Sequence, residues 1–383
     1  MPTYARYPVT LVRGEGTRVW DDSGASYLDM IGGLGALSLG HAHPRWVAAV
    51  TDAVRAIGLT SNLVSTLPQE RLAARIAART PVDDARVFLC NSGAEANEAL
   101  LKLVRKHGLL AGRPTIVVLE GSFHGRTVAT LAATGQPAKR APFEPLLDWF
   151  RFAAPDDLDA LDAALAPGDV AAVFLEPVLG EGGVVPLSAA YLQAVRARCD
   201  AAGALLAVDE VQAGSGRAGS WLAIEGADVR PDVVSLAKAL GGGLPIGALI
   251  APAAIGFGPG EHGSTFGGGP VPSAAALAVL DVIDDQDLLA NVRAMGALLR
   301  SEVARLAPAG TLADVRGAGL LLGFEASAGI AAGDVAAALR TRGVLASTAG
   351  ANTVRFTPPY TIGPDEVDEA VKALAAALEE VAP

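Results

Sequence analysis

The middle of the chain alternates short apolar runs with longer segments of helical periodicity. The runs of strand length are residues 86–90, 115–120, 169–176, 204–210, 232–236 and 247–250, and helical patterns cover 93–107 and 188–202. Almost unbroken apolar runs are typical of parallel strands that are buried on both faces. Strands separated by helices predict right-handed crossovers. The pattern therefore predicts an α/β fold with a sheet covered on both sides.

The pattern changes from Ala274 onward. A long helical stretch runs to about Leu306, and a strand at 320–325, a helix at 334–342, a strand at 353–356 and a helix at 365–381 follow. This mixture predicts a smaller α+β domain. The first 57 residues are rich in turns, and their pattern alone does not place them.

Composition narrows the class of protein. The chain has 383 residues, of which 51% are apolar and 19% charged, and its formal net charge is −11. That length predicts two or three domains, and the apolar content excludes disorder as the main state. The acidic balance argues against general nucleic-acid binding, which requires clustered Lys and Arg.

The number of cysteines and the composition of the uncharged segments bear on where in the cell the protein is found. Cys90 and Cys199 are the only cysteines, so we expect no disulfide framework and a cytoplasmic protein. We expect no targeting segment in residues 1–12. The uncharged run 239–260 holds too many Gly and Pro for a membrane helix, and we expect loops and a short strand there.

Residues 91–98 are the first candidate site, directly after a predicted strand. Ser92 with Glu95 three residues later predicts a capping box at the start of a helix. Gly93 and Ala94 have minimal side chains, so their backbone N–H groups are open to a ligand. Open amides at a helix N-terminus bind phosphate, although an ordinary capped helix gives the same pattern.

Two further candidate sites follow predicted strands. Phe123 and Arg126 could stack on a flat ring and hold a carboxylate, or lie in a surface loop. Asp209 ends a buried strand, where a carboxylate is costly unless it meets a cation such as a pyridinium nitrogen. A helix cap or a salt bridge would also explain Asp209.

Lys238 is the most informative single residue. It is the only lysine between Lys139 and Lys372, and it lies in an apolar stretch followed by three glycines. Burial lowers the pKa of an amine and makes it nucleophilic. A buried lysine without a chemical role is rare.

Two further patterns give weaker signals. Residues 214–219 fit G-x-G-x-x-G, but residues 211–213 separate them from the strand and no helix is predicted after them, as a dinucleotide site requires. The five histidines do not form a set with metal-ligand spacing, so we expect no metal.

Taken in order, these features resemble the fold-type-I pyridoxal-phosphate enzymes, and within them the class III aminotransferases, above all the acetylornithine aminotransferases. The stretches that carry the resemblance are 40–44, 60–63, 91–98, 123–127, 135–137, 176–183, 209–212, 237–243, 262–268, 316–319 and Arg355. The resemblance implies a large domain over 58–273 with a mostly parallel seven-stranded sheet. It implies a smaller α+β domain built from 1–57 and 274–383.

The resemblance also implies pyridoxal phosphate as cofactor and a role for each matching residue. Lys238 would bond to the cofactor, and Asp209 would pair with its pyridine nitrogen; these two are the expected catalytic residues. The other expected cofactor-binding residues are Ser92, Gly93, Ala94, Phe123, His124, Val211, Gln212 and, reaching across a dimer, Thr265. The expected substrate-binding residues are Arg126 for the donor carboxylate, Arg355 for 2-oxoglutarate, Glu181 as the partner of Arg355, and Asn62.

The activity implied is a ping-pong transfer of the δ-amino group of N2-acetyl-L-ornithine to 2-oxoglutarate, in arginine biosynthesis, by a homodimer with shared active sites. Ornithine, succinylornithine, γ-aminobutyrate and a carrier-linked lysine remain alternative donors, because Val64 and Gly269 depart from the family pattern. Two other classes stay open from the residues alone. A nicotinamide-dependent dehydrogenase would be indifferent to Lys238→Ala, and a silent binding protein would have no need of Lys238, Asp209 and Arg126 together.

Overall fold

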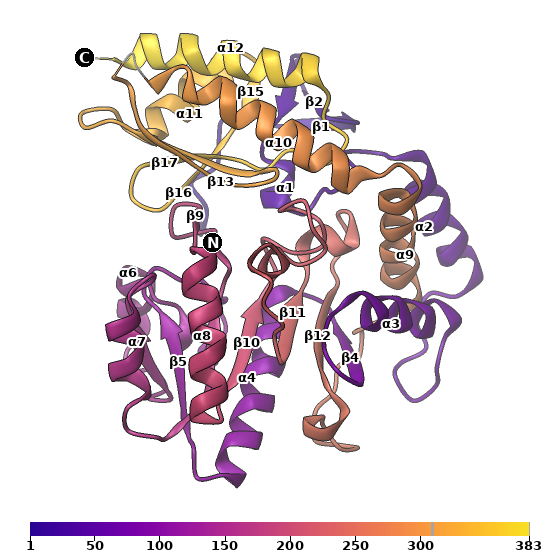
Figure 1. The fold of residues 1–383 in the computed structure, drawn as a ribbon. Helices are drawn as coiled ribbons and strands as arrows, with labels where there is room; N and C mark the ends of the chain where they lie inside the picture. Colours follow the sequence, from indigo (N-terminus) through magenta and orange to yellow (C-terminus); the bar gives the residue numbers. More distant parts are fainter. Residues whose placement is uncertain (308–309, 383) are drawn as a thin grey trace.

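A seven-stranded sheet forms the centre of the computed structural model, which describes residues 1–307 and 310–382 (Figure 1). The strand order is β4-β12-β11-β10-β7-β5-β6. The bounds are β4 Ala85–Cys90, β5 Thr115–Leu119, β6 Phe150–Ala153, β7 Val170–Leu175, β10 Leu205–Asp209, β11 Val233–Leu236 and β12 Gly247–Pro252. Only β12 runs antiparallel to its neighbours. The predicted mostly parallel α/β sheet is confirmed.

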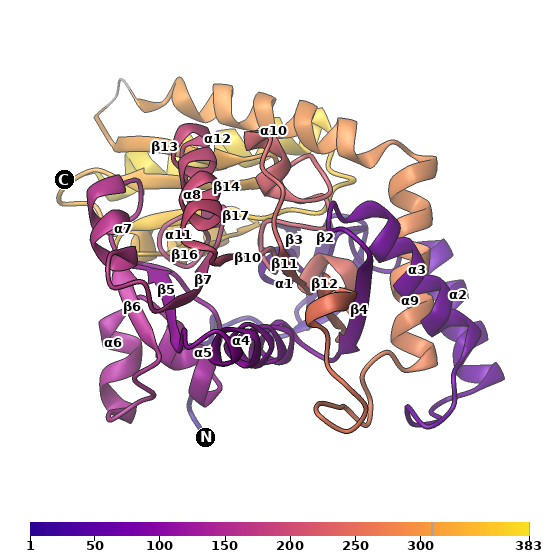
Figure 2. The ribbon, with the colours of Figure 1, turned by 60° about the horizontal axis from the view of Figure 1, so that its bottom comes forward.

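Both faces of this sheet are covered by helices, because successive strand residues point to opposite sides. Ile116 and Val118 pack with α4 (Gly93–Leu110) and α5 (Val128–Ala133). Val117 and Leu119 pack with α7 (Leu158–Leu165) and α8 (Ala189–Ala202). Figure 2 shows α4 on one side of the strands and α7 and α8 on the other.

A second layer of strands and helices lies above the carboxyl side of the central sheet (Figure 1, top). One four-stranded sheet joins the two ends of the chain, in the order β1-β2-β3-β15, and another has the order β13-β14-β17-β16. The bounds are β1 Leu11–Glu15, β2 Arg18–Asp21, β3 Ser26–Asp29, β13 Leu312–Ala318, β14 Leu321–Ala326, β15 Val344–Leu345, β16 Ser347–Ala349 and β17 Thr353–Phe356. The helices here are α10 Leu288–Ala304, α11 Ala332–Thr341 and α12 Pro364–Val381.

The helical stretch predicted from Ala274 to about Leu306 is two helices, which corrects the prediction. Two residues separate helix α9 (Pro270–Asp285) from α10, and one of them, Asp287, has φ 47°. A residue in the left-handed region cannot continue an α-helix. The break lets α9 pack on α2 (Pro44–Ala56) and α3 (Leu67–Arg79), while α10 joins the second layer.

The remaining elements are short. They are α1 Gly32–Gly35, α6 Pro137–Arg140, the hairpin β8 Val178–Leu179 with β9 Val185–Pro186, and the 3₁₀ helices Ala141–Phe143, Ala223–Ala227, Lys238–Gly241 and Ala253–Ile255. Residues 239–260 thus form turns around β12, as predicted, and no helix in the described part of the chain could cross a membrane. Residues 214–219 form turns, and the helix after them is a 3₁₀ helix rather than the α-helix of a dinucleotide site.

The topology brings several chain segments to one edge of the central sheet. The parallel strands β10 and β11 end at Asp209 and Leu236, and β4 ends at Cys90, opposite Gly247 at the start of β12. Ligands of open α/β sheets bind at the carboxyl ends of their strands. The residues that follow these strands therefore define the place to look for a site.

Candidate active site

A cavity of about 420 Å³ lies at this edge of the sheet. It is lined by Ala36, Asn91, Ser92, Gly93, Ala94, Asn97, Phe123, His124, Gly125, Arg126, Glu176, Asp209, Val211, Gln212, Ala237, Lys238, Gly243, Leu244, Pro245 and Ile246. Ten of the fourteen residues expected from the sequence are in this wall. The other four are Asn62, Glu181, Thr265 and Arg355.

The N-terminus of α4 forms one wall of the cavity. Ser92 is the N-cap, and its Oγ accepts a hydrogen bond from the Glu95 amide at 3.2 Å. The Glu95 carboxylate accepts from the Asn91 amide at 2.6 Å, not from Ser92 as a full capping box requires. The Gly93 and Ala94 amides belong to the first helical turn, which has no intrahelical acceptors, so they can bind an anion in the cavity.

Gly93 is required for the close packing of this wall. A Cβ atom at Gly93 would lie 2.6 Å from Cγ1 of Val211, well inside van der Waals contact. Val211 follows the end of β10, so the missing side chain lets the helix start approach the Asp209 turn. The anion site and the carboxylate of Asp209 therefore line the same cavity.

Asp209 is buried, and neighbouring groups fix the orientation of its carboxylate. Oδ1 accepts from the Val211 amide at 3.0 Å, and Oδ2 accepts from Nδ2 of Asn97 at 2.7 Å. Nδ1 of His124 lies 2.8 Å from Oδ2, and the His124 ring stacks on Phe174 at 3.9 Å. A carboxylate held in this way can receive a cationic ring nitrogen from the cavity.

Lys238 lies in the cavity wall just past the end of β11. Its φ is 41°, in the left-handed region that non-glycine residues adopt at a cost in energy. Burial lowers the pKa of the Lys238 amine, while the carboxylates of Glu181 and Asp209 oppose that shift. A lowered pKa increases the share of neutral amine, which is the form that attacks a carbonyl and accepts a proton.

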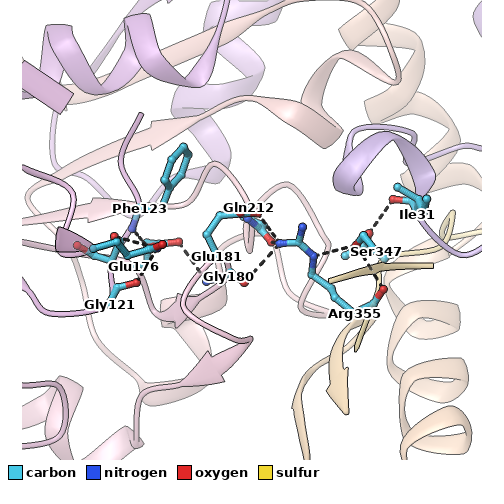
Figure 3. Close-up of polar contacts among 12 residues, drawn as sticks. Ile31, Gly121, Phe123, Glu176, Gly180, Glu181, Gln212, Ser347 and Arg355 are labelled. Carbon is cyan, nitrogen blue, oxygen red and sulfur yellow. Dashed lines mark hydrogen bonds and ion pairs between the residues drawn. The ribbon is translucent and has the colours of Figure 1, made fainter. Parts of the chain in front are cut away.

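Phe123 is positioned by Glu176, a buried residue at the end of β7 (Figure 3). Oε1 of Glu176 accepts from the Phe123 amide at 2.8 Å, and Oε2 accepts from the Gly180 amide at 3.3 Å. Burial, with a contribution from the charge of Asp209, raises the pKa of Glu176 to about 8. The guanidinium carbon of Arg126 lies 5.6 Å from the Phe123 ring centre.

Arg355 on β17 is the centre of a second cluster of polar side chains, which lies beside the cavity (Figure 3). It is buried, and its Nη1 lies 2.6 Å from Oε1 of Glu181 and 3.0 Å from Oε1 of Gln212. Its Nε donates to Oγ of Ser347 at 3.2 Å. Burial acts to raise the pKa of Glu181, but Arg355 lowers it below its ordinary value. Gln212 is part of the cavity wall and connects this group to it.

Asn62 and Thr265 lie outside the cavity of their own chain. Nδ2 of Asn62 donates to the Ser264 and Gly267 carbonyls at 2.7 and 3.0 Å, and its Oδ1 accepts from Gln69. Thr265 is exposed within the loop that Asn62 holds. The roles expected for these two residues stay predictions.

Three residues around the site were missed by sequence reasoning: Asn97, Glu176 and Lys139. Asn97 is a buried polar residue on the face of α4 that also carries Ala96, Leu100 and Leu101. Glu176 directly follows a fully buried strand. A polar residue in an apolar setting was the available signal for both. Lys139 had no such signal, because its neighbours come from distant segments.

The wall of the cavity fits pyridoxal phosphate on chemical grounds. Open amides at a helix start suit a phosphate, a carboxylate suits a protonated ring nitrogen, and Phe123 and Val211 offer apolar surfaces for a planar ring. Nε2 of His124 is buried and has no hydrogen-bond partner among the described residues, which leaves it free for a ligand.

Comparison with known proteins decides the family. The family described as Aminotransferase class-III matches residues 2–378 of the chain. The chain belongs to the class-III aminotransferases. The resemblance found in the sequence is thus confirmed, and this class-III aminotransferase has the enzymatic class expected from its motifs.

Individual relatives support the same assignment. This class-III aminotransferase is 46% identical to the acetylornithine aminotransferase of Thermosynechococcus vestitus, across 100% of the chain and 95% of that relative. It superposes on the crystal structure of N-acetylornithine aminotransferase from Stenotrophomonas maltophilia with a TM-score of 0.86 and 38% identity, covering 98% and 97% of the two chains. Ornithine aminotransferase from Toxoplasma gondii, reported with pyridoxal phosphate at partial occupancy in its active site, gives a TM-score of 0.94 at 32% identity, covering 100% and 92%.

Proposed function

We propose that this aminotransferase transfers the δ-amino group of N2-acetyl-L-ornithine to 2-oxoglutarate, giving N-acetyl-glutamate semialdehyde and glutamate. The observation that carries the proposal is 46% identity over the whole chain to an acetylornithine aminotransferase, together with a cavity that contains the matching residues. The reaction belongs to arginine biosynthesis. Its two half-reactions use one site in turn, which is a ping-pong scheme.

Pyridoxal phosphate is the cofactor in this proposal. Ser92, Gly93 and Ala94 would hold its phosphate, and Phe123 and Val211 would lie against its ring. Asp209 would pair with the ring nitrogen, with His124 and Gln212 beside the cofactor. When bound, the cofactor supplies an electron sink for the carbon that loses a proton.

Lys238 is proposed as the residue that carries the proton. Its lowered pKa raises the share of neutral amine, and in that form Lys238 can accept a proton from the donor carbon and later return one, as general base and then acid. Asn97 and His124 keep the Asp209 carboxylate in a fixed orientation throughout. Positioning of this kind contributes to catalysis because the groups need no reorganisation during the reaction.

Arg126 and Arg355 are proposed to bind carboxylates of the two substrates. Arg126 is exposed at the cavity wall and forms no ion pair within residues 1–307 and 310–382, so it is available for the donor. Arg355 is closed off by Glu181. Opening of that pair would free Arg355 for 2-oxoglutarate, so that one site accepts two substrates of different shape.

We also propose that the enzyme is a homodimer in which Thr265 reaches the phosphate of the neighbouring active site. Exposed apolar side chains near this loop support the proposal, since Leu63 is 94% exposed and Phe266 62% exposed. Asn62 joins their two segments. A cytoplasmic location is proposed on the two buried free thiols, Cys90 and Cys199.

The proposed domain division is a large domain over 58–273 and a small domain of 1–57 and 274–383. The parallel pairing of β3 with β15 supports a small domain made from both ends of the chain. Helix α9 runs across the boundary between 273 and 274, so it would belong to both domains.

The first experiment is a visible absorption spectrum of the purified enzyme with pyridoxal phosphate. N2-acetyl-L-ornithine alone should bleach the cofactor band, and 2-oxoglutarate should restore it. Lys238→Ala should reduce turnover by at least about 10³-fold, whereas Lys372→Ala on the exposed face of α12 should leave it unchanged. A band that responds to ornithine, succinylornithine, γ-aminobutyrate or a carrier-linked lysine instead would change the donor. A band that responds to no amine would overturn the proposal.

A further inference from the structure

Lys139 lies between Phe123 in the cavity wall and Glu181, the partner of Arg355. None of the roles proposed above involves it. It belongs to α6, and its side chain is 24% exposed. Its Nζ lies 4.9 Å from the centre of the Phe123 ring and 2.5 Å from Oε1 of Gln136. Gln136 in turn donates to the Gly121 carbonyl at 3.1 Å. Lys139 is therefore tethered beside the residue that covers one side of the cavity.

The two oxygens of Glu181 face two different cations. Oε1 lies 2.6 Å from Nη1 of Arg355, while Oε2 lies 3.9 Å from Nζ of Lys139. The same Nη1 also donates to Oε1 of Gln212 and to the Gly180 carbonyl, so Glu181 shares this nitrogen with two other acceptors. Among the described residues Lys139 has one hydrogen bond, and its stem is long and flexible, so a movement of about 1 Å would bring it into contact with Glu181.

Opening the Arg355–Glu181 pair has an electrostatic cost. A carboxylate that loses its partner in a mostly buried setting keeps its desolvation penalty without the compensating attraction. The charge of Glu181 therefore needs another cation when Arg355 leaves. Among the groups that shift the pKa of Glu181, the cations are Arg355, Lys238 and Lys139, and Lys238 is the amine proposed to take part in the reaction.

We propose that Lys139 is a positioning residue that receives the carboxylate of Glu181 when Arg355 turns to a substrate carboxylate. The inference rests on the proposed function, because it assumes that Arg355 binds 2-oxoglutarate. Lys139 lowers the cost of freeing Arg355 and acts only through Glu181. It assists the acceptor half-reaction and leaves the donor half-reaction unchanged, since Arg355 and Glu181 stay paired while the donor is bound.

The test uses Lys139→Met, which removes the charge and keeps most of the stem, in the enzyme loaded with cofactor. The two half-reactions are followed separately in single turnovers. The 2-oxoglutarate concentration for half-maximal rate should rise roughly three- to tenfold, in the range expected for one partly buried charge pair, with no change for the donor. Lys139→Arg should restore it to within about twofold of the parent enzyme, because it keeps the positive charge. Lys372→Met is the matched control on α12.

A Glu181→Gln background separates the proposed role from direct attraction of the substrate. Lys139→Met should have no further effect there, because Lys139 would then have no carboxylate to receive. An effect of the same size in both backgrounds would overturn the proposal, as would an equal loss in both half-reactions. Binding of glutarate by calorimetry gives a readout that needs no turnover, and its affinity should fall by the same factor in Lys139→Met. If the parent enzyme takes no amino group from any donor, the proposed function fails, while the glutarate comparison still decides the role of Lys139.

Discussion

Glu210 shows what a single buried carboxyl group does to this protein. It directly follows Asp209 and is 1% exposed. Oε1 accepts from the Ile224 amide at 2.9 Å, and Oε2 has no partner within the described chain. Burial raises the pKa of Glu210 from 4.5 to about 8. Folding therefore favours the protonated form of this group.

This shift predicts how stability depends on pH. A raised pKa in the folded state contributes stability that is fully present below pH 4.5 and is lost as the pH rises through about 8. Compared with Glu210→Gln, the parent protein should therefore lose on the order of a few kcal/mol of unfolding free energy between pH 4.5 and pH 8.5. Denaturant unfolding of both proteins at the two pH values measures it.

The control is Glu379→Gln, an exposed position on α12. It should show the same pH dependence as the parent protein. If Glu210→Gln also follows the parent at both pH values, Glu210 does not take up a proton on folding.

The sequence predicts the role of a site residue only where neighbouring residues form a recognisable motif. Ser92, Gly93 and Ala94 follow a strand and begin a helix, so neighbouring residues suffice to predict an anion site. Lys139 lies 4.9 Å from the centre of the Phe123 ring and 3.9 Å from the carboxylate of Glu181, which is in the turn between β8 and β9. Such a contact depends on tertiary packing and leaves no local pattern.

At the scale of elements, the start of α8 depends on Ser188. Its Oγ accepts from the Tyr191 amide at 3.2 Å and donates to Oδ1 of Asp156 at 2.7 Å. Ser188→Ala should lower the unfolding free energy by about 1 kcal/mol, the usual cost of losing an N-cap. Chemical denaturation measures the loss, and turnover should not change because α8 lies outside the cavity wall.

The control for Ser188→Ala is another Ser→Ala substitution, placed in the interior of a helix. Ser301 lies in α10, where its hydroxyl donates back to the Leu298 carbonyl. Ser301→Ala should be neutral or slightly stabilising, because alanine favours the helix interior. Equal losses at both positions would show that the cap of Ser188 contributes nothing.

The elements that pattern did not predict are those without a continuous apolar run. Strand β6 is at the edge of the sheet, and three of its four residues are only partly buried. Strand β13 contains Asp314 and Arg316, so its pattern reads as polar. Strands β5, β7, β10, β11 and β12 lie inside the sheet and were predictable because burial on both faces requires apolar side chains. Strand β4 was predictable from its apolar run, although it is at the other edge and only two of its six residues are buried. The break at Asp287 had no Gly or Pro to mark it.

At the scale of the whole molecule, several exposed apolar side chains lie on two segments that Asn62 connects, and we call them the apolar patch. It consists of Leu59, Leu63, Val64 and Leu67 on one segment and Phe266 on the loop that Asn62 holds. Patches of this kind mark association surfaces. The proposed homodimer would cover this patch.

The dimer is tested by placing charge in the patch. Leu63→Asp combined with Phe266→Asp should shift the molecular mass in analytical ultracentrifugation from dimer toward monomer, because burying two carboxylates opposes association. Turnover should fall as the dimer dissociates if Thr265 binds the phosphate in the neighbouring active site. Leu110→Asp, at the far end of α4 and 84% exposed, is the control and should stay dimeric. A parent protein that sediments as a monomer would contradict the proposal.

The pairing of β3 with β15 has a consequence for synthesis. Leu28 and Asp29 leave the ribosome more than 300 residues before their partners Val344 and Leu345. At 5–20 residues per second, the early strands wait roughly 15 to 60 s for them. During that interval Leu28, fully buried in the finished protein, has no partner strand at this edge. Until residues 344 and 345 have been made, this edge of β3 is open to pairing with another chain, which is how unpaired strand edges promote aggregation.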